Sequence, residues 1–326
     1  MNLIDFKFEG GGCLRAISTI SQIYPNYSYK RQLVKAINYL NQLCPIISNN
    51  QIDIFDQVNE KLPSIDIDGT RAFLFHKVNQ NGRVYIFDQN HEGEFISVTK
   101  LALNETAALG LHREAKVLKL LAGRTEFQIP ALKLYKVWNK GCLIQMSAVC
   151  CDHIIHGKNQ ILPEKLFNAI GKLRNPNAPK MLPAGLIDGW QTSRKHILTP
   201  SICQIAMKIQ TNNDFRVSAA HGDLGSENVF YRPNTCEVDD FTLIDWEFFS
   251  ETAPAMTDHV GAWLGRKHRA IKGWRKSNPN ELAANFLSDF ENTPGGKTSA
   301  VLALLYLAEI GIDLACFLIG KKNDAL

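Results

Sequence analysis

AHGDLGSENVFYRPNTCEVDDFTLIDWEFFS, residues 220–250, is the most informative segment of the sequence. An HGD tripeptide ends at Asp223, and Asn228 follows five residues later. A turn at RPN separates this loop from the apolar run LIDWE, which contains Asp245. One loop thus presents a carboxylate and an amide, and a hairpin delivers a second carboxylate beside them. Phosphoryl transfer uses such a set, because one Asp orients the acceptor hydroxyl while an Asn and a second Asp hold Mg²⁺ on the ATP phosphates.

HGDxxxxN followed by IDWE resembles the motif of the aminoglycoside phosphotransferase/choline kinase family, whose fold is similar to that of eukaryotic protein kinases. The resemblance implies that Asp223 is the catalytic base, Asn228 a magnesium ligand and Asp245 the principal magnesium ligand, with ATP as the phosphoryl donor. His221 would then support the catalytic loop. Asp258, at the start of the next predicted helix, would fix that loop in place.

The N-terminal half contains short apolar runs that are typical of antiparallel strands. Three of them are rich in aromatic and β-branched residues and are separated by turn residues: AFLFHKV at 72–78, RVYIFDQ at 83–89 and EFISVTKLAL at 94–103. A helix is predicted next, because Asn104 is a candidate N-cap and apolar residues recur at helical spacing up to Gly123. LKLYKVW at 132–138 and CLIQMSAV at 142–149 predict a further hairpin.

The resemblance requires a lysine on the third strand of such a sheet and a glutamate on the following helix. Lys100 ends the third predicted strand, and Glu114 lies on the helix face that packs toward the sheet. Because a carboxylate on a buried face needs a partner, we expect the two side chains to form an ion pair. In the implied site this pair clamps the α- and β-phosphates of ATP.

Two further parts of a nucleotide site follow from the resemblance. The backbone of Gln145, Met146 and Ala148 would form the hinge that hydrogen-bonds adenine. The turn at residues 79–83 would cover the phosphates, and it contains one glycine where such loops often contain more. The resemblance covers about residues 70–265.

Length and composition indicate a globular protein with two lobes. The chain has 326 residues, of which 45% are apolar and 21% charged. We expect an α+β, two-lobed protein-kinase-like fold. Residues 1–65 would form an extension without an assigned role, packed on the N-lobe. Residues 66–147 would form an N-lobe of antiparallel sheet with one key helix, and residues 148–326 a mainly helical C-lobe that carries the catalytic loop.

The N-terminal extension contains one readable element, KRQLVKAINYLNQL at residues 30–43. Its residues Leu33, Ile37, Leu40 and Leu43 recur at helical spacing, which predicts an amphipathic helix. The eight cysteines of the chain make no CxxC pair, and the first ten residues contain no secretion signal. These features favour a reduced, cytoplasmic protein.

VLALLYLAEIGIDLACFL, residues 301–318, is apolar but carries Glu309 and Asp313. An acidic residue at the centre of a bilayer costs about 2.5–3.5 kcal/mol, so the stretch predicts one buried C-terminal helix and no transmembrane segment. On one continuous helix, Glu309 and Asp313 would share a face. They would either line the acceptor cleft or form an exposed rim.

The net charge of +4 is unevenly distributed. Residues 1–148 contain 17 basic and 13 acidic residues, whereas the remainder contains 19 of each. Because the presumed acceptor lobe is not acidic, a polycationic aminoglycoside is not favoured as the acceptor. The basic run GRKHRAIKGWRK at 265–276 includes Arg266, Arg269 and Lys272. It is either a solvated surface or a patch that binds an anionic group.

These observations predict an ATP-dependent kinase that transfers the γ-phosphoryl group to a hydroxyl of a small molecule, with sugar-like or amino-alcohol acceptors favoured. Asp258 follows Asp245 by only thirteen residues, which leaves no room for the long activation segment of protein kinases, so no protein substrate is expected. Two alternatives stay open. One is a nucleotide-binding module without turnover, and the other is a protein that binds lipid or nucleic acid through residues 265–276. Glu227, beside Asn228, receives no role.

Overall fold

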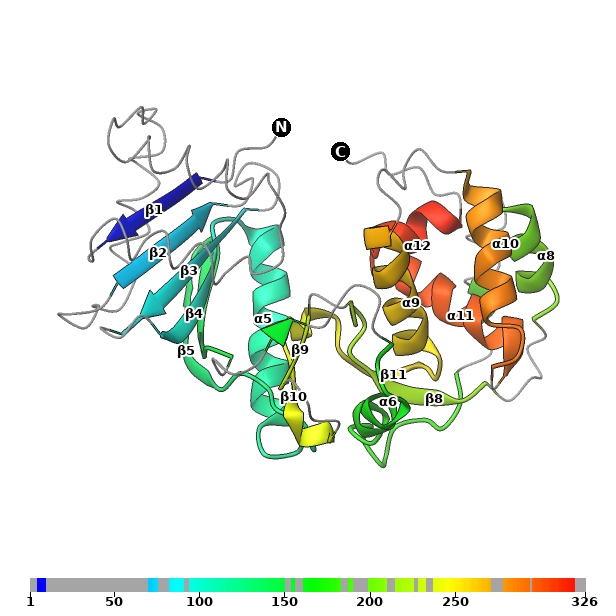
Figure 1. Ribbon diagram of the computed structural model, residues 1–326, viewed down its shortest axis with the longest axis horizontal. Helices are drawn as coiled ribbons and strands as arrows, with labels where there is room; N and C mark the ends of the chain where they lie inside the picture. Colours follow the sequence, from blue (N-terminus) through cyan, green and yellow to red (C-terminus); the bar gives the residue numbers. More distant parts are fainter. Residues whose placement is uncertain are drawn as a thin grey trace. The chain divides into compact units, whose positions relative to one another are not determined.

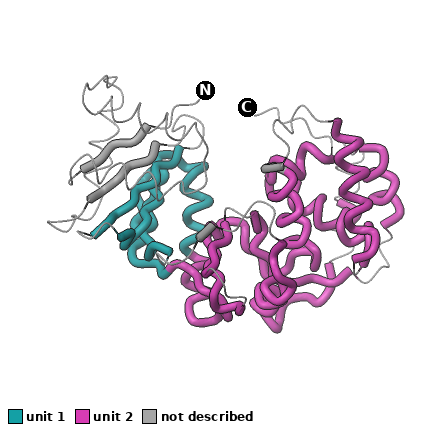
Figure 2. The backbone as a smooth tube through the Cα atoms, in the orientation of Figure 1, with its two compact units in different colours: residues 1–115, 131–151 teal, residues 116–130, 152–326 magenta. Residues whose placement is uncertain are grey.

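The computed structural model divides the chain into two compact units (Figure 2). Unit 1 comprises residues 1–115 and 131–151, and unit 2 comprises residues 116–130 and 152–326. The structure describes residues 5–9, 70–75, 82–90, 94–149, 154–155, 161–182, 187–189, 199–209, 215–225, 228–232, 237–270, 278–293 and 295–319. The predicted helix at 30–43, most of the predicted phosphate-covering turn, Glu227 and Lys272 lie outside the described residues.

Unit 1 is built on a six-stranded antiparallel sheet (Figure 1). Its strands follow the order β1 (Asp5–Glu9), β2 (Thr70–Phe75), β3 (Arg83–Gln89), β4 (Phe95–Ala102), β6 (Gly141–Ser147) and β5 (Leu132–Trp138). The predicted meander forms β2, β3 and β4, and the predicted hairpin forms β5 and β6, so both are confirmed. Strand β1 was not predicted, and it pairs with β2 along its whole length.

Helix α5 (Glu105–Leu121) packs against one face of this sheet (Figure 1). The side-chain Oδ1 of Asn104 accepts a hydrogen bond from the backbone N of Ala107 at 2.8 Å, which satisfies one of the N–H groups that a helix start leaves unpaired. The predicted N-cap is therefore confirmed. Gly123 follows the helix in the left-handed region with φ 72°, where glycine is the favoured residue.

Unit 2 is mainly helical, with short strands between the helices. Its helices are α6 (Glu164–Gly171), α8 (Pro200–Ala206), α9 (Thr257–Ala270), α10 (Pro279–Asp289), α11 (Gly296–Glu309) and α12 (Asp313–Leu318). Its strands are β7 (Ile154–Ile155), β8 (Val217–Ala220), β9 (Val229–Tyr231), β10 (Phe241–Leu243) and β11 (Ser250–Pro254), with 3₁₀ turns at Val238–Asp240 and Trp246–Phe248. A sheet with one helix in unit 1 and a mainly helical unit 2 confirm the predicted α+β class.

The prediction of one continuous C-terminal helix is wrong. The chain forms α11 and α12 with a break between them at Gly311, whose φ of 94° no helical residue adopts. The backbone N of Ile312 turns back to the carbonyl of Leu307 at 2.9 Å, which closes the end of α11. Glu309 and Asp313 therefore lie on different helices, and both are exposed. None of the helices in the described ranges is long and apolar enough to cross a membrane.

Asn104→Ala tests the origin of helix α5. The change removes the side-chain acceptor of the Ala107 N–H, so we expect a loss of about 1 kcal/mol in the free energy of unfolding, measured by urea denaturation. Thr106→Ala, at the exposed second residue of the same helix, is the control and should change the free energy by less than about 0.5 kcal/mol. Equal effects of the two changes would contradict the cap.

Candidate active site

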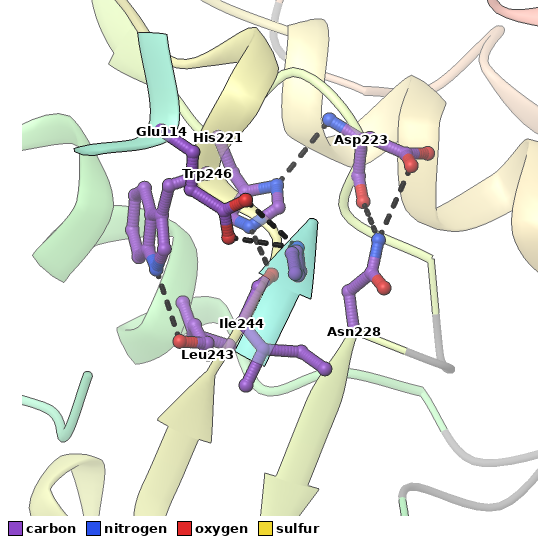
Figure 3. Close-up of polar contacts among 8 residues, drawn as sticks. Glu114, His221, Asp223, Asn228, Leu243, Ile244 and Trp246 are labelled. Atoms are coloured by element: carbon purple, nitrogen blue, oxygen red, sulfur yellow. Dashed lines mark hydrogen bonds and ion pairs between the residues drawn. The ribbon is translucent and has the colours of Figure 1, made fainter. Parts of the chain in front are cut away.

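A buried ion pair lies at the centre of unit 1. The Nζ of Lys100, on β4, lies 2.8 Å from both carboxylate oxygens of Glu114, on α5 (Figure 3). Lys100 is 6% exposed and Glu114 is 1% exposed, so water solvates neither charge appreciably. Two charges in such surroundings persist only when they pair in good geometry. The ion pair that the sequence predicts is therefore present, and it joins the helix to the central strand.

The sheet face that carries Lys100, called here the Lys100 face, is otherwise apolar at this point. The strand register places Tyr85 opposite Lys100 across β3 and β4, and places Phe87 opposite Val98. Met146 of β6 lies opposite Val98 on the other side. Phe87 and Val98 are partly exposed, whereas Met146 is buried. Beside a buried cation, these side chains offer the kind of apolar surface that a planar base contacts.

The three predicted hinge residues, Gln145, Met146 and Ala148, differ in their backbone pairing. Gln145 lies on the opposite side of the sheet, where its Nε2 donates to the Oγ of Ser97 at 3.2 Å. Gln145 and Met146 are also paired with strands on both sides, so their backbone groups belong to the β-ladders. Ala148, just beyond the strand, donates to the carbonyl of Ile96 at 3.5 Å, the outer limit of a hydrogen bond. The backbone groups of Gln145 are thus engaged within the sheet.

The loop that follows β8 in unit 2 brings Asp223 and Asn228 together. The Nδ2 of Asn228 donates to the backbone carbonyl of Asp223 at 2.8 Å and to its carboxylate at 3.2 Å (Figure 3). Because the amide nitrogen is used in this way, the Oδ1 of Asn228 is the atom that can face a cation. The carbonyl of Asn228 accepts from the N of Ile244 at 3.1 Å, which brings the residue before Asp245 to the same loop.

His221 is buried and its two ring nitrogens have distinct partners (Figure 3). Its Nε2 lies 2.9 Å from the carbonyl of Ile244, which can only accept a hydrogen bond. Its Nδ1 accepts from the backbone N of Asp223 at 3.3 Å. These partners assign a neutral imidazole with the proton on Nε2. His221 thus ties the catalytic loop to the strand end that carries Asp245, and it has no acid–base role of its own.

Asp258, near the start of α9, holds the backbone of the same loop. Its two carboxylate oxygens accept from the N–H groups of His221 at 2.9 Å and Gly222 at 3.1 Å. Burial raises the pKa of Asp258 to about 6, and these two hydrogen bonds oppose the rise. The carboxylate faces backbone amides, so its geometry is that of a residue that positions the loop.

The backbone around Asp245 is in an unusual conformation. Asp245 has φ 68° and ψ 61°, and it is the one non-glycine residue with positive φ in the described part of the chain. Such a conformation costs on the order of 1 kcal/mol and is concentrated at functional sites. Gly222 has φ 87°, and a Cβ at this position would lie 2.4 Å from the carbonyl of Phe248. The loop of Asp223 and the segment after Asp245 therefore touch through a position that only glycine can occupy.

Aromatic rings support the segment after Asp245. Trp246 is fully buried, and its Nε1 donates to the carbonyl of Leu243 at 3.0 Å. Its ring lies 4.5 Å from that of His221 and stacks on Phe127 at 5.9 Å, with an interplanar angle of 3°. Sequence reasoning missed Phe127, because 118 residues separate it from Asp245 and a phenylalanine in a loop carries no signal of its own.

The donor set fits a magnesium ion that is held together with nucleotide phosphates. Mg²⁺ prefers oxygen ligands and is usually bound by one or two side chains plus phosphate oxygens and waters. Asp245 supplies a carboxylate and Asn228 an amide oxygen, both half-buried or buried. Within the described ranges, no three His, Cys, Asp or Glu side chains cluster closely enough to hold a metal alone. The protein atoms therefore suit a shared, phosphate-bridged ion and not a closed protein cage.

The basic run at 265–276, for which a patch that binds an anionic group was one alternative, begins with residues that already have an acidic neighbour. Lys267 forms an ion pair with Asp289 at 3.5 Å and lies 5.1 Å above the ring of Trp263. The Nε1 of Trp263 donates to the same carboxylate at 2.7 Å. Burial lowers the pKa of Arg266, which the charge of Asp289 opposes. The side chain of Arg269 lies outside the described residues. These contacts favour a packed surface over a patch for an external anion.

No family model and no curated protein matches the sequence. Among solved structures, the GDP complex of wild-type aminoglycoside 2′-phosphotransferase-IIIa matches with a TM-score of 0.48 and 14% identity, over 82% of this chain and 96% of that chain. The GDP and kanamycin complex of APH(2″)-IIia matches with a TM-score of 0.47 and 14% identity, over 80% and 100%. A macrolide 2′-phosphotransferase from Brachybacterium faecium matches with a TM-score of 0.47 and 11% identity, over 82% and 97%. At these values the likeness decides neither the activity nor the acceptor of this chain.

Asp258→Asn should change how stability depends on pH. The unfolded Asp has a pKa of about 3.9, so the folded protein, with a pKa of about 6, holds the Asp258 proton more tightly. This stabilisation is present below about pH 4 and is lost as the pH rises through 6. At about 1.4 kcal/mol per pKa unit, the wild type should lose on the order of 2–3 kcal/mol relative to Asp258→Asn between pH 4 and pH 7 in urea denaturation. Asp239→Asn, an exposed control, should leave the pH profile parallel to that of the wild type. A parallel profile for Asp258→Asn as well would refute the assignment.

Proposed function

We propose that this protein is an ATP- or GTP-dependent phosphotransferase that moves a γ-phosphoryl group to a hydroxyl of a small molecule. The observation that carries the proposal is the loop from His221 to Asn228. In it, Asn228 holds the carboxylate of Asp223, and its carbonyl binds the strand end that leads to Asp245. A carboxylate held by an amide, with a second carboxylate following in a left-handed turn, is the arrangement that in-line phosphoryl transfer uses.

Asp223 is the catalytic base of the proposed reaction. It is partly exposed, and the Asn228 amide orients its carboxylate by a hydrogen bond at 3.2 Å. An oriented carboxylate can accept the proton of an acceptor hydroxyl as that oxygen attacks the γ-phosphorus. Buried His221 has both ring nitrogens engaged, so it does not compete for this role.

Asp245 and Asn228 would hold Mg²⁺ through side-chain oxygens. The ion neutralises charge on the transferring phosphoryl group when it is bound. Lys100 would contact the α- and β-phosphates, and Glu114 orients the Lys100 ammonium. Phe87, Val98 and Met146 on the Lys100 face would contact the base, and Ala148 would be the first residue beyond the strand with a backbone N–H able to reach it.

Sugar-like and amino-alcohol compounds are proposed because the charge of residues 149–326 is balanced, which does not favour a polycation. Two of the similar structures hold GDP, so GTP should be tested beside ATP as the donor. A nucleotide-consumption screen over sugars, amino alcohols, nucleosides and aminoglycosides addresses both questions at once.

Variants of the two carboxylates separate chemistry from nucleotide binding. Asp223→Asn should lower kcat by about 10²–10⁴-fold and keep the thermal shift caused by Mg-nucleotide, because only the proton acceptor is lost. Asp245→Asn should lose most of the Mg-dependent part of that shift. Asp239→Asn, exposed in unit 2, is the control for loss of one carboxylate and should match the wild type. A wild type that shows the shift without turnover on any acceptor, water included, would instead indicate a nucleotide-binding module. Unchanged kcat in Asp223→Asn would refute the proposed base.

A paired substitution separates the stability that the Lys100–Glu114 pair contributes from its role toward phosphate. Lys100→Met leaves a buried carboxylate without its cation, which should cost about 3–5 kcal/mol of stability and weaken nucleotide binding. Lys100→Met combined with Glu114→Gln removes both charges and should recover most of the melting temperature. If Lys100 binds phosphate, nucleotide affinity stays low in the double variant, measured by calorimetric titration. Recovery of affinity together with stability would show that the pair only supports the fold.

A further inference from the structure

A short segment of unit 2, residues 125–128, runs beside β10 in the manner of an added strand. The backbone N of Gln128 donates to the carbonyl of Phe241 at 2.8 Å, and its carbonyl accepts from the N of Leu243 at 3.0 Å, which makes a parallel bridge. Along its other edge, β10 pairs with β9. Strand β10 is therefore held on both sides, up to the residue two positions before Asp245.

The 125–128 segment also contacts the residue that follows Asp245. The ring of Phe127 is buried and lies parallel to that of Trp246. The Oγ1 of Thr125 donates to the carbonyl of Phe127 at 2.6 Å, so the segment is closed by a bond of its own. One segment thus contacts the chain on both sides of Asp245, through the backbone before it and through an aromatic ring after it.

Contacts on both sides restrict the backbone of Asp245. Its left-handed conformation, with φ 68° and ψ 61°, persists in a non-glycine residue only when the surroundings determine it. Ile244, the residue before it, is bonded to the catalytic loop through the carbonyl of Asn228 and the ring of His221. The catalytic loop therefore holds Ile244, and the 125–128 segment holds the residues on either side of the Ile244–Asp245 pair.

We propose that Phe127 and Gln128 are positioning residues for the magnesium site, because they hold Asp245 in its left-handed conformation and so fix the position of its carboxylate. This inference rests on the proposed function, which assigns Mg²⁺ to Asp245. Groups that orient a metal ligand commonly change metal affinity by about 10–100-fold when they are removed. Two uncharged residues outside the catalytic motifs would then set the affinity of the protein for the ion.

The first test is a titration of MgCl₂ at saturating ADP or GDP, followed by the melting temperature of the full chain. Phe127→Leu keeps an apolar side chain and removes the flat ring, so the Mg²⁺ concentration at half-maximal shift should rise at least about tenfold. Phe286→Leu is the matched control, because Phe286 is fully buried in α10 and contacts the ring of Trp263 at 5.2 Å. It should lower the melting temperature and keep the wild-type Mg²⁺ midpoint. An unchanged midpoint in Phe127→Leu, or an equal rise in both variants, would overturn the proposal.

Hydrogen–deuterium exchange without nucleotide separates this inference from the proposed function. Backbone amides of residues 243–246 should exchange at least about tenfold faster in Phe127→Leu and at the wild-type rate in Phe286→Leu. Phe127→Met, which also lacks the ring, replaces Phe127→Leu if that variant does not fold. A wild type without any Mg-dependent shift would refute the proposed function, and the exchange rates would still decide whether Phe127 holds Asp245. Unchanged rates at residues 243–246 would show that it does not.

Discussion

A single buried carboxylate holds the backbone on which the candidate active site of unit 2 depends. Asp258 accepts the N–H groups of His221 and Gly222, and the residue that follows them is Asp223. Two consecutive amides bonded to one rigid group leave the next side chain little freedom. The charge is costly to bury, as the raised pKa of Asp258 shows. A neutral residue at this position would cost less free energy to bury. A charge kept there is typical of a group that positions a functional site.

The constraint continues from the loop into the segment that carries Asp245. Gly222 takes a left-handed conformation and leaves room for the carbonyl of Phe248, while Asp245 takes a left-handed conformation of its own. The left-handed conformation of a non-glycine residue such as Asp245 is unfavourable by itself, so its surroundings must hold it. The buried rings of His221 and Trp246, 4.5 Å apart, supply that support. The two carboxylates of the site are thus set by one connected group of contacts.

Local patterns in the sequence predicted the elements of the fold, and contacts between distant residues explain what they missed. Strand runs bounded by turn residues and the Asn104 cap depend on neighbours in the chain, so β2 to β6 and α5 were predictable. The pairing of the Gln145 backbone with strands on both sides depends on register, which the motif resemblance does not contain. The break at Gly311 lies inside an apolar run, and hydrophobic periodicity alone does not distinguish one helix from two consecutive helices. Strand β1 is only five residues long, and its partner β2 lies more than sixty residues away in the chain, so local patterns could not predict this pairing.

The candidate nucleotide side of unit 1 depends on a strand that is polar on both faces. Along β4, Ser97 and Thr99 lie on one face of the sheet, called here the outer face, and Lys100 lies on the other; all three are buried. Buried polar groups are usually hydrogen-bonded, and Ser97 and Lys100 find their partners on neighbouring elements. Glu114 serves Lys100 from α5, whereas Asp88 and Gln145 serve Ser97 from the flanking strands. These partners lie on different elements, so sliding β4 by one residue would exchange the faces and break both sets of contacts. The position of the Lys100 ammonium is therefore fixed by both faces of the sheet, and a change on the outer face can reach the site without touching it.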